Sequence, residues 1–209
     1  MGEIKKIVLV DLCDTLYPCN TTIGFINWIS GNKHKKILSS VIIKCISRLI
    51  YSLTKFDLIR FIYIKKINGY SRKDLVDLAG AYIESLVPNE LIIDIVNDYK
   101  RKGYCIYIIS ASLDVIVESA TNKLNYSGFK ASELNYIDGK ATGKLRNDLL
   151  GNKNILIKKF KEDCDELIFI TDNFSDSNCI DLCNEFYAVI PRNKRTTFWN
   201  SKQINIIEL

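Results

Sequence analysis

The sequence predicts an α/β fold: a doubly wound parallel sheet with helices on both faces and an inserted all-helical cap. Two observations predict it. From Pro88 onward, short apolar runs alternate with amphipathic helical stretches, whereas residues 18–87 show helical patterns alone. Strand–helix–strand units joined by right-handed crossovers build parallel sheets that are covered on both faces. We therefore expect a core made of residues 1–17 and 88–209 and a helical cap made of residues 18–87.

The first strand is expected at residues 7–10, an apolar run that ends directly before Asp11. In the cap segment, Ser71 and Asp74 have the spacing of a capping box, and apolar side chains recur at helical spacing behind them. A helical cap over the strand tips can choose substrates and exclude water.

The core elements that follow the cap come in a regular order. A helix is expected at residues 89–102, with Gly103 as its stop. The further elements are, in chain order, a strand at 104–109, a helix at 113–125, irregular or extended chain around 138–139, a helix at 152–161, a strand at 167–170, a helix at 180–185 and a strand at 186–190.

Composition excludes several classes of protein. The 209 residues are 47% hydrophobic and 25% charged, which is typical of soluble globular proteins. The seven cysteines form no CxxC pair, so we expect reduced thiols and no disulfide framework. His34 is the single histidine, which argues against a zinc site and against serine or cysteine triads. Because the apolar stretch before Asp11 is too short for an export signal, we expect a cytoplasmic protein.

The net charge of +5 is concentrated in one segment, in which Asp57 is the single acid between residues 33 and 73. Such a field favours anions: a phosphorylated small molecule or an anionic membrane surface. Residues 37–53 are apolar but interrupted by Lys44 and Arg48, which predicts an amphipathic helix that packs inside the cap or lies on a membrane surface. We do not expect nucleic acid, because no basic platform interleaved with aromatic residues occurs.

Acids follow two apolar runs that lie far apart in the chain. Asp11 ends the first run, and Asp172 ends the run at residues 167–170. In an open α/β sheet the strand tips line the crevice where ligands bind, so the two carboxylates can converge on one cation. Mg²⁺ prefers oxygen ligands and few protein carboxylates, which makes it the expected cofactor. A transferring phosphoryl group also needs a hydroxyl and a cation, for which Ser110 and Lys153 are candidates.

The order of these residues resembles the haloacid dehalogenase (HAD) superfamily, whose members use an aspartate nucleophile. Its motifs are an Asp-x-Asp-x-Thr loop, a Ser or Thr after the second strand, a downstream Lys and a later acidic pair. The matching residues are Asp11, Thr15, Ser110, Lys153, Asp172 and Asp176. The local sequences around them resemble the phosphoserine-phosphatase-like branch, whose members carry a helical cap between the first and second motifs.

The resemblance implies a Rossmann-like core and a specific site. Asp11 would be the nucleophile, and Lys153 a second catalytic residue. The implied phosphate ligands are Thr15, Ser110, Ala111 and Lys153. The implied metal ligands are Asp11, the backbone carbonyl of Cys13, Asp172 and Asp176. Alternatively, Asp176 is the N-cap of the following helix. Ser112 is expected to cap the helix after the second strand.

The sequence departs from the superfamily at the residue that usually protonates the leaving oxygen. Cys13 stands where the second Asp is expected, and Asp14 where Gly is usual. Three interpretations follow: Asp14 acts as a substitute acid, Cys13 itself weakly protonates a good leaving group, or the protein has drifted toward binding. Positioned acid–base catalysis contributes about 10² to 10⁴ in rate, so its loss would slow turnover without abolishing transfer to Asp11.

The sequence therefore predicts a Mg²⁺-dependent phosphatase or phosphotransferase that acts on a phosphorylated metabolite or lipid head group through an aspartyl phosphate. The alternative is a catalytically impaired relative that binds a phosphorylated ligand or a partner protein, and a dehalogenase is a lesser one. The sequence indicates neither the substrate nor the oligomeric state.

Overall fold

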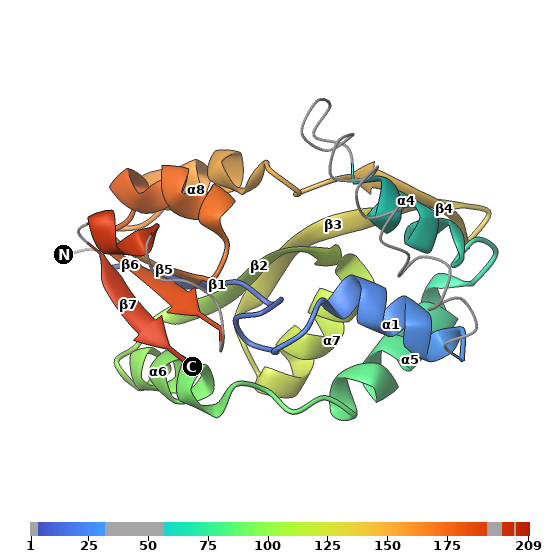
Figure 1. Ribbon diagram of the computed structural model, residues 1–209, viewed down its shortest axis with the longest axis horizontal. Helices are drawn as coiled ribbons and strands as arrows, with labels where there is room; N and C mark the ends of the chain where they lie inside the picture. Colours follow the sequence, from blue (N-terminus) through green and yellow to red (C-terminus); the bar gives the residue numbers. More distant parts are fainter. Residues whose placement is uncertain (1–3, 32–56, 192–197, 203) are drawn as a thin grey trace.

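β1 (Lys6–Val10) lies inside a sheet that has seven strands in the part of the chain described, in the order β4-β3-β2-β1-β5-β6-β7 (Figure 1). The computed structural model describes residues 4–31, 57–191, 198–202 and 204–209. The other strands are β2 (Cys105–Leu113), β3 (Gly128–Ile137), β4 (Lys140–Asn147), β5 (Glu166–Thr171), β6 (Glu185–Ile190) and β7 (Asn205–Glu208). Neighbours are parallel, apart from the antiparallel pair β3 and β4. The predicted α/β class is confirmed.

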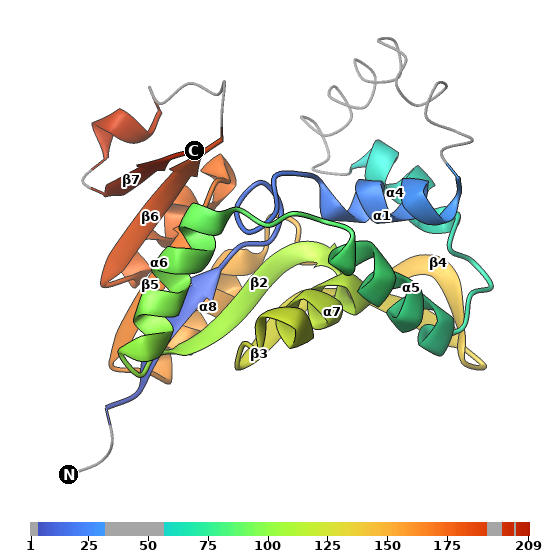
Figure 2. The same ribbon diagram turned by 90° about the horizontal axis from the view of Figure 1, so that it is seen from below.

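Alternate side chains of β1 pack against opposite layers. Val8 and Val10 belong to the same apolar core as buried residues of α6 (Glu90–Arg101) and α7 (Asp114–Leu124), two helices that Figure 2 shows on one face of the sheet. Ile7 and Leu9 belong to a second core with α8 (Lys153–Glu162). Because side chains of a strand point alternately to its two faces, a strand covered on both sides reads as a continuous apolar run. The expected helices at 89–102, 113–125 and 152–161 are these three helices.

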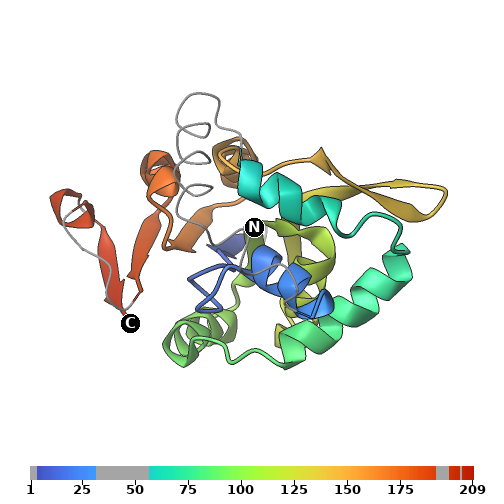
Figure 3. The ribbon, with the colours of Figure 1, turned by 45° about the vertical axis from the view of Figure 1, so that its right-hand side comes forward.

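Three helices fall within the described part of the predicted cap segment: α1 (Thr21–Ile29), α4 (Leu58–Lys65) and α5 (Arg72–Glu84). The Ser71 side chain accepts a hydrogen bond from Asp74 N and caps α5, as its sequence predicts. α1 packs against α4 and also contacts β2, and Figure 3 shows the three helices together beside the sheet. The boundaries of the cap stay a prediction.

The expected amphipathic helix at residues 37–53 lies outside the described residues. Among the residues that are described, no helix is long and apolar enough to cross a membrane.

The irregular or extended chain expected around residues 138–139 is a β-hairpin, since β3 and β4 pair on either side of Asp138 and Gly139. Both turn residues have positive φ, the backbone that an Asp-Gly hairpin turn requires. The hairpin also supports α4 closely. A Cβ on Gly143 would lie 2.9 Å from Lys65 Cα at the end of α4, so only glycine allows this approach.

The structure differs from the prediction at two places near the C-terminal end. A 3₁₀ helix, η1 (Phe174–Leu182), takes the place of the α-helix expected at residues 180–185. The edge strand β7 was not expected at all.

β2 extends beyond the strand expected at residues 104–109. Its register against β3 shifts between Ile109 and Leu113, so Ser110 lies within an irregular stretch of the strand and not after its end. Such irregularities re-aim side chains and are frequent beside active sites. The ends of β1 and β5 thus present Asp11 and Asp172, and the irregular stretch of the neighbouring strand β2 presents Ser110 next to them.

Candidate active site

Asp11 is positioned by the strand next to it. Its backbone N–H donates to Ile170 O at 2.9 Å, which continues the pairing of β1 with β5 past Val10. One carboxylate oxygen, Oδ1, accepts from Leu12 N at 2.7 Å, while Thr171 Oγ1 donates to Oδ2 at 3.5 Å. The side chain is almost fully buried, so these contacts fix its direction.

Lys153, the first residue of α8, joins two buried acids. Its Nζ donates to Asp11 Oδ2 at 2.5 Å and to Asp176 Oδ2 at 2.9 Å. Burial alone would lower the pKa of Lys153, but the carboxylates of Asp11 and Asp176 outweigh burial and raise it. Burial raises the pKa of Asp176, against the opposing effect of Lys153. The ammonium group is therefore a permanent positive charge beside Asp11.

Asp176 is not the N-cap of the element that follows β5. Asn173 is the cap, because its Oδ1 accepts from Ser175 N at 3.1 Å. The Asp176 carboxylate instead accepts from Lys153 and from Thr171 Oγ1 at 2.9 Å. These bonds place Asp176 on the lysine, and it is not among the residues that line the cavity next to Asp11.

Thr15 connects the loop after β1 to the tip of β5. Its Oγ1 accepts from Asp172 N at 3.0 Å and donates to Asp172 Oδ1 at 3.4 Å. Thr15 is completely buried and is not among the cavity-lining residues, and its hydroxyl is hydrogen-bonded to Asp172. Its expected role as a phosphate ligand stays a prediction. Its role here is to hold Asp172 beside the Asp11 loop.

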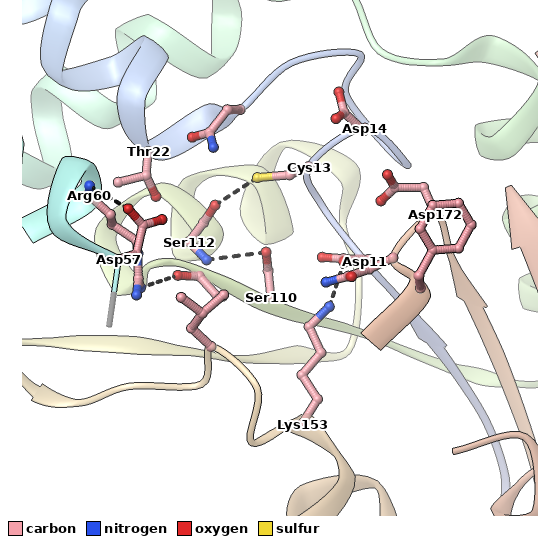
Figure 4. A pocket seen from close by; sticks show the side chains of 15 residues that line it. Asp11, Cys13, Asp14, Thr22, Asp57, Arg60, Ser110, Ser112, Lys153 and Asp172 are labelled. Atoms are coloured by element: carbon pink, nitrogen blue, oxygen red, sulfur yellow. Dashed lines mark hydrogen bonds and ion pairs between the residues drawn. The ribbon is translucent and has the colours of Figure 1, made fainter. Parts of the chain in front are cut away.

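The cavity beside Asp11 has a volume of about 280 Å³ (Figure 4). It brings together residues from the loop after β1, from β2, from α8, from the chain after β5, and from α1 and the start of α4. Its lining is Asp11, Cys13, Asp14, Asn20, Thr22, Asp57, Arg60, Ser110, Ala111, Ser112, Leu150, Lys153, Asp172, Asn173 and Phe174. Of the residues that the sequence singles out, the cavity thus collects the proposed nucleophile, the hydroxyl, the lysine and the second acid.

The thiol of Cys13 is part of a closed hydrogen-bond triangle. Its Sγ is hydrogen-bonded to Thr21 Oγ1 and to Ser112 Oγ, both at 3.1 Å, and these hydroxyls are 2.5 Å apart. Burial, and next the nearby Asp11 charge, raise the pKa of Cys13, so the thiol keeps its proton. Ser112 does not cap α7, because Leu113 occupies the N-cap position and makes no side-chain cap bond.

Asp14 also lines the cavity, with a φ of 53°. Asp tolerates this left-handed backbone better than most residues, although Gly adopts it most easily. Figure 4 shows Asp14 on the side of the cavity where Asp172 lies.

Sequence reasoning missed Asp57 and Arg60, which reach the cavity from α4. Asp57 caps α4, since its Oδ1 accepts from Arg60 N at 2.9 Å. A signal for Asp57 was present, because it is the single acid of the basic segment. No local pattern marks Arg60, whose partners lie far along the chain.

The oxygen donors beside the cavity fit a magnesium ion. Asp11 and Asp172 come from adjacent strand tips, and the backbone carbonyl of Cys13 lies in the same loop as Asp11. No group of three His, Cys, Asp or Glu side chains that could hold a metal occurs in the described residues. Mg²⁺ does not need such a group, because it usually binds through one or two carboxylates and keeps several waters.

Comparisons with solved structures show where this fold occurs. A phosphoserine phosphatase, solved as an analogue of its phospho-aspartyl intermediate, is 18% identical with a TM-score of 0.68 over 98% of this chain and 94% of that chain. A protein of unknown function from Bordetella pertussis Tohama I is 13% identical with a TM-score of 0.78, over 98% and 99%. A HAD family hydrolase from Salmonella enterica serovar Typhi is 15% identical with a TM-score of 0.71, over 98% and 67%.

The chain therefore shares its fold with phosphoserine phosphatases and with a HAD family hydrolase, which confirms the resemblance at the level of the fold. No protein-family model matches the chain, and no curated protein matches it.

Proposed function

We propose that this protein is a magnesium-dependent phosphatase or phosphotransferase that acts on a phosphorylated metabolite or lipid head group through an aspartyl phosphate at Asp11. One observation carries the proposal: Lys153 Nζ lies 2.5 Å from Asp11 Oδ2 beside a cavity that Ser110 and Asp172 also line. A buried carboxylate next to a fixed cation, a hydroxyl and a second carboxylate suits phosphoryl transfer, in which catalysis is mostly positioning and charge neutralisation.

Asp11 attacks phosphorus through a carboxylate oxygen, and the bond from phosphorus to the alcohol oxygen breaks. The Lys153 ammonium reduces the repulsion between the carboxylate and the anionic phosphate, and Ser110 Oγ donates to a phosphate oxygen. Water then breaks the bond between the Asp11 oxygen and phosphorus, which releases phosphate and restores the carboxylate.

Asp11, Asp172 and the Cys13 carbonyl would hold Mg²⁺. When bound, the ion would neutralise phosphate charge and reduce its repulsion from Asp11. Thr15 keeps Asp172 in place for this role through its bond to the Asp172 backbone. Asp176 supports the site indirectly, by fixing Lys153.

Proton transfer is the weak step. The departing alkoxide must gain a proton, and the neighbouring Cys13 thiol has a raised pKa and is hydrogen-bonded to Thr21 and Ser112. We propose that turnover is slow on alkyl phosphates and faster on aryl phosphates, whose leaving groups need less protonation. Asp14 is the alternative donor.

This weakness favours a second candidate function, a binding protein for a phosphorylated ligand. An aryl phosphate assay with MgCl₂ or EDTA separates the two. The enzyme hypothesis expects magnesium-dependent turnover that Asp11→Asn abolishes; the binding hypothesis expects none in the wild type, but magnesium-dependent binding of a phosphate monoester. A dehalogenase, the lesser alternative, would release halide from haloacids.

The location is also a proposal. We propose a cytoplasmic protein whose basic segment between residues 33 and 73 can contact an anionic membrane surface. Co-sedimentation with vesicles of phosphatidylserine and phosphatidylcholine at low salt tests the contact, and protein left wholly in the supernatant contradicts it.

A further inference from the structure

Only two basic side chains line the cavity within the described part of the chain, Lys153 and Arg60. Lys153 is held by Asp11 and Asp176 and faces the phosphoryl site. Among the described residues, Arg60 is therefore the one basic side chain left in the lining for a second anionic group of a substrate. Whether Arg60 can receive such a group depends on its present partners.

The guanidinium of Arg60 is fully engaged at both terminal nitrogens. Nη1 donates to Asp148 Oδ1 and Oδ2 at 2.8 and 2.7 Å, and Nη2 donates to Ala111 O at 2.6 Å and Ser132 Oγ at 3.0 Å. Each terminal nitrogen carries two hydrogens, so these four bonds use all of them. The Arg60 side chain is 10% exposed, and its charge is neutralised by Asp148, whose own side chain is 42% exposed.

Other bonds hold Asp148 in place as the partner of Arg60. Asp148 Oδ1 also accepts from Ser132 Oγ at 3.0 Å and from Leu150 N at 2.9 Å. Ser132 Oγ in turn accepts from Leu149 N at 3.0 Å. A substrate carboxylate would have to break several of these bonds to reach the guanidinium.

The cavity wall near Arg60 presents oxygen atoms. Asp57 and Thr22 lie beside Arg60 in Figure 4. The Asp57 carboxylate is at the first turn of α4, and it accepts from Arg60 N. A negative group placed here would face a carboxylate, whereas a hydroxyl or an ammonium group would find acceptors.

We propose that the substrate is a phosphate monoester whose alcohol part carries no anionic group, being neutral or cationic. This proposal rests on the proposed function and narrows its substrate class. It sets this chain apart from the phosphoserine phosphatases that share its fold, because the alcohol part of phosphoserine carries a carboxylate.

O-phosphoethanolamine and O-phosphoserine form a matched pair that differs by that one carboxylate. Their affinities are measured by calorimetry on Asp11→Asn protein with MgCl₂, and also as inhibition constants against aryl phosphate turnover by the wild type. We expect phosphoserine to bind about tenfold or more weakly. Glycerol 3-phosphate, whose alcohol part is neutral, is measured as well. Binding as tight as that of phosphoethanolamine indicates that the site only rejects anions, whereas weaker binding indicates that it prefers a cation.

A further variant tests whether the pairing of Arg60 with Asp148 causes the discrimination against phosphoserine. Asp148→Asn removes the charge that neutralises Arg60 and keeps an acceptor oxygen, so the ratio of phosphoserine to phosphoethanolamine affinity should rise about tenfold. Asp138→Asn, in the turn between β3 and β4, is the matched control and should leave the ratio unchanged.

Equal or tighter binding of phosphoserine by the Asp148-intact protein overturns the substrate class while leaving the phosphatase proposal in place. If phosphoserine binds more weakly than phosphoethanolamine, as expected, but the wild type turns over no phosphate ester, the phosphatase proposal falls and the preference for a ligand without a second anionic group stands. If no phosphate monoester binds, both fall.

Discussion

Lys153 Nζ donates to Asp11 Oδ2 at 2.5 Å across 142 residues of sequence, and both side chains are almost fully buried. The pair joins the start of α8 to the tip of β1, next to the cavity. We expect this geometry to affect both the proposed reactivity and the stability of the site.

Replacing Lys153 with Met should destabilise the fold as well as remove activity. The substitution leaves Asp11 and Asp176 buried without their cation, which costs about 3–5 kcal/mol in the free energy of unfolding. Urea denaturation measures the loss. Lys153→Arg, which keeps the charge, should lose clearly less stability, and an equal loss in the two variants would show that size and not charge decides.

Replacing Thr15 with Val should weaken magnesium binding. The variant keeps the shape but leaves the Asp172 backbone N–H without the acceptor it has at 3.0 Å. A buried donor that loses its partner costs about 1–3 kcal/mol. Calorimetric titration with MgCl₂ measures the affinity, and Thr15→Ser, which restores the hydroxyl, should recover it. Unchanged affinity in Thr15→Val would refute the positioning role of Thr15.

Replacing Cys13 with Asp should speed turnover of alkyl phosphates. A carboxylic acid at this position can protonate the leaving oxygen, and such catalysis contributes about 10² to 10⁴ in rate. The gain should be much smaller on aryl phosphates, whose leaving groups are good. Cys13→Asn controls for shape and polarity, and an equal gain in the Asn variant would argue against acid catalysis.

Replacing Asp114 with Asn should change how stability depends on pH. Burial raises the pKa of Asp114 in the folded protein, so folding favours its protonated form. The contribution of Asp114 to stability is therefore lost as pH rises from its unfolded pKa, about 3.9, through its raised folded pKa. The free energy of unfolding of Asp114→Asn minus that of the wild type should therefore be more favourable at pH 7 than near pH 3. Urea denaturation at each pH measures this difference.

Glu166 provides a control of opposite sign. The hydrogen bond from Tyr104, followed by the one from Lys6, lowers its folded pKa. Its contribution to stability is present above the unfolded pKa and is lost as pH falls through the folded one. Glu166→Gln should therefore be less stable than the wild type at pH 7, with a difference that shrinks in acid. If Glu166→Gln and Asp114→Asn respond to pH alike, the direction of at least one of the two shifts is wrong.

The sequence predicts the part of the site that strand ends determine. Apolar runs locate β1 and β5, and parallel pairing brings their tips together, so Asp11 and Asp172 are found from sequence. The hairpin of β3 and β4 was missed because its strands are largely polar, although Asp138 with Gly139 is a strong turn signal.

Contacts between distant side chains are what the sequence does not reveal. Arg60 meets Asp148 across 88 residues, and Thr21 meets Ser112 across 91. Both pairs depend on where α1 and α4 pack, which local periodicity does not determine. The long-range bonds of Thr15, which take its hydroxyl to Asp172, have the same origin.

Trapping the phosphoenzyme tests the central claim most directly. The protein is incubated with an aryl phosphate and MgCl₂, quenched in acid and digested, and the peptides are analysed by mass spectrometry. We predict a phosphoryl group on Asp11 in the wild type, which accumulates because position 13 provides no carboxylic acid, and none in Asp11→Asn. Magnesium-dependent turnover with the phosphoryl group on another residue, or undiminished in Asp11→Asn, would contradict the account.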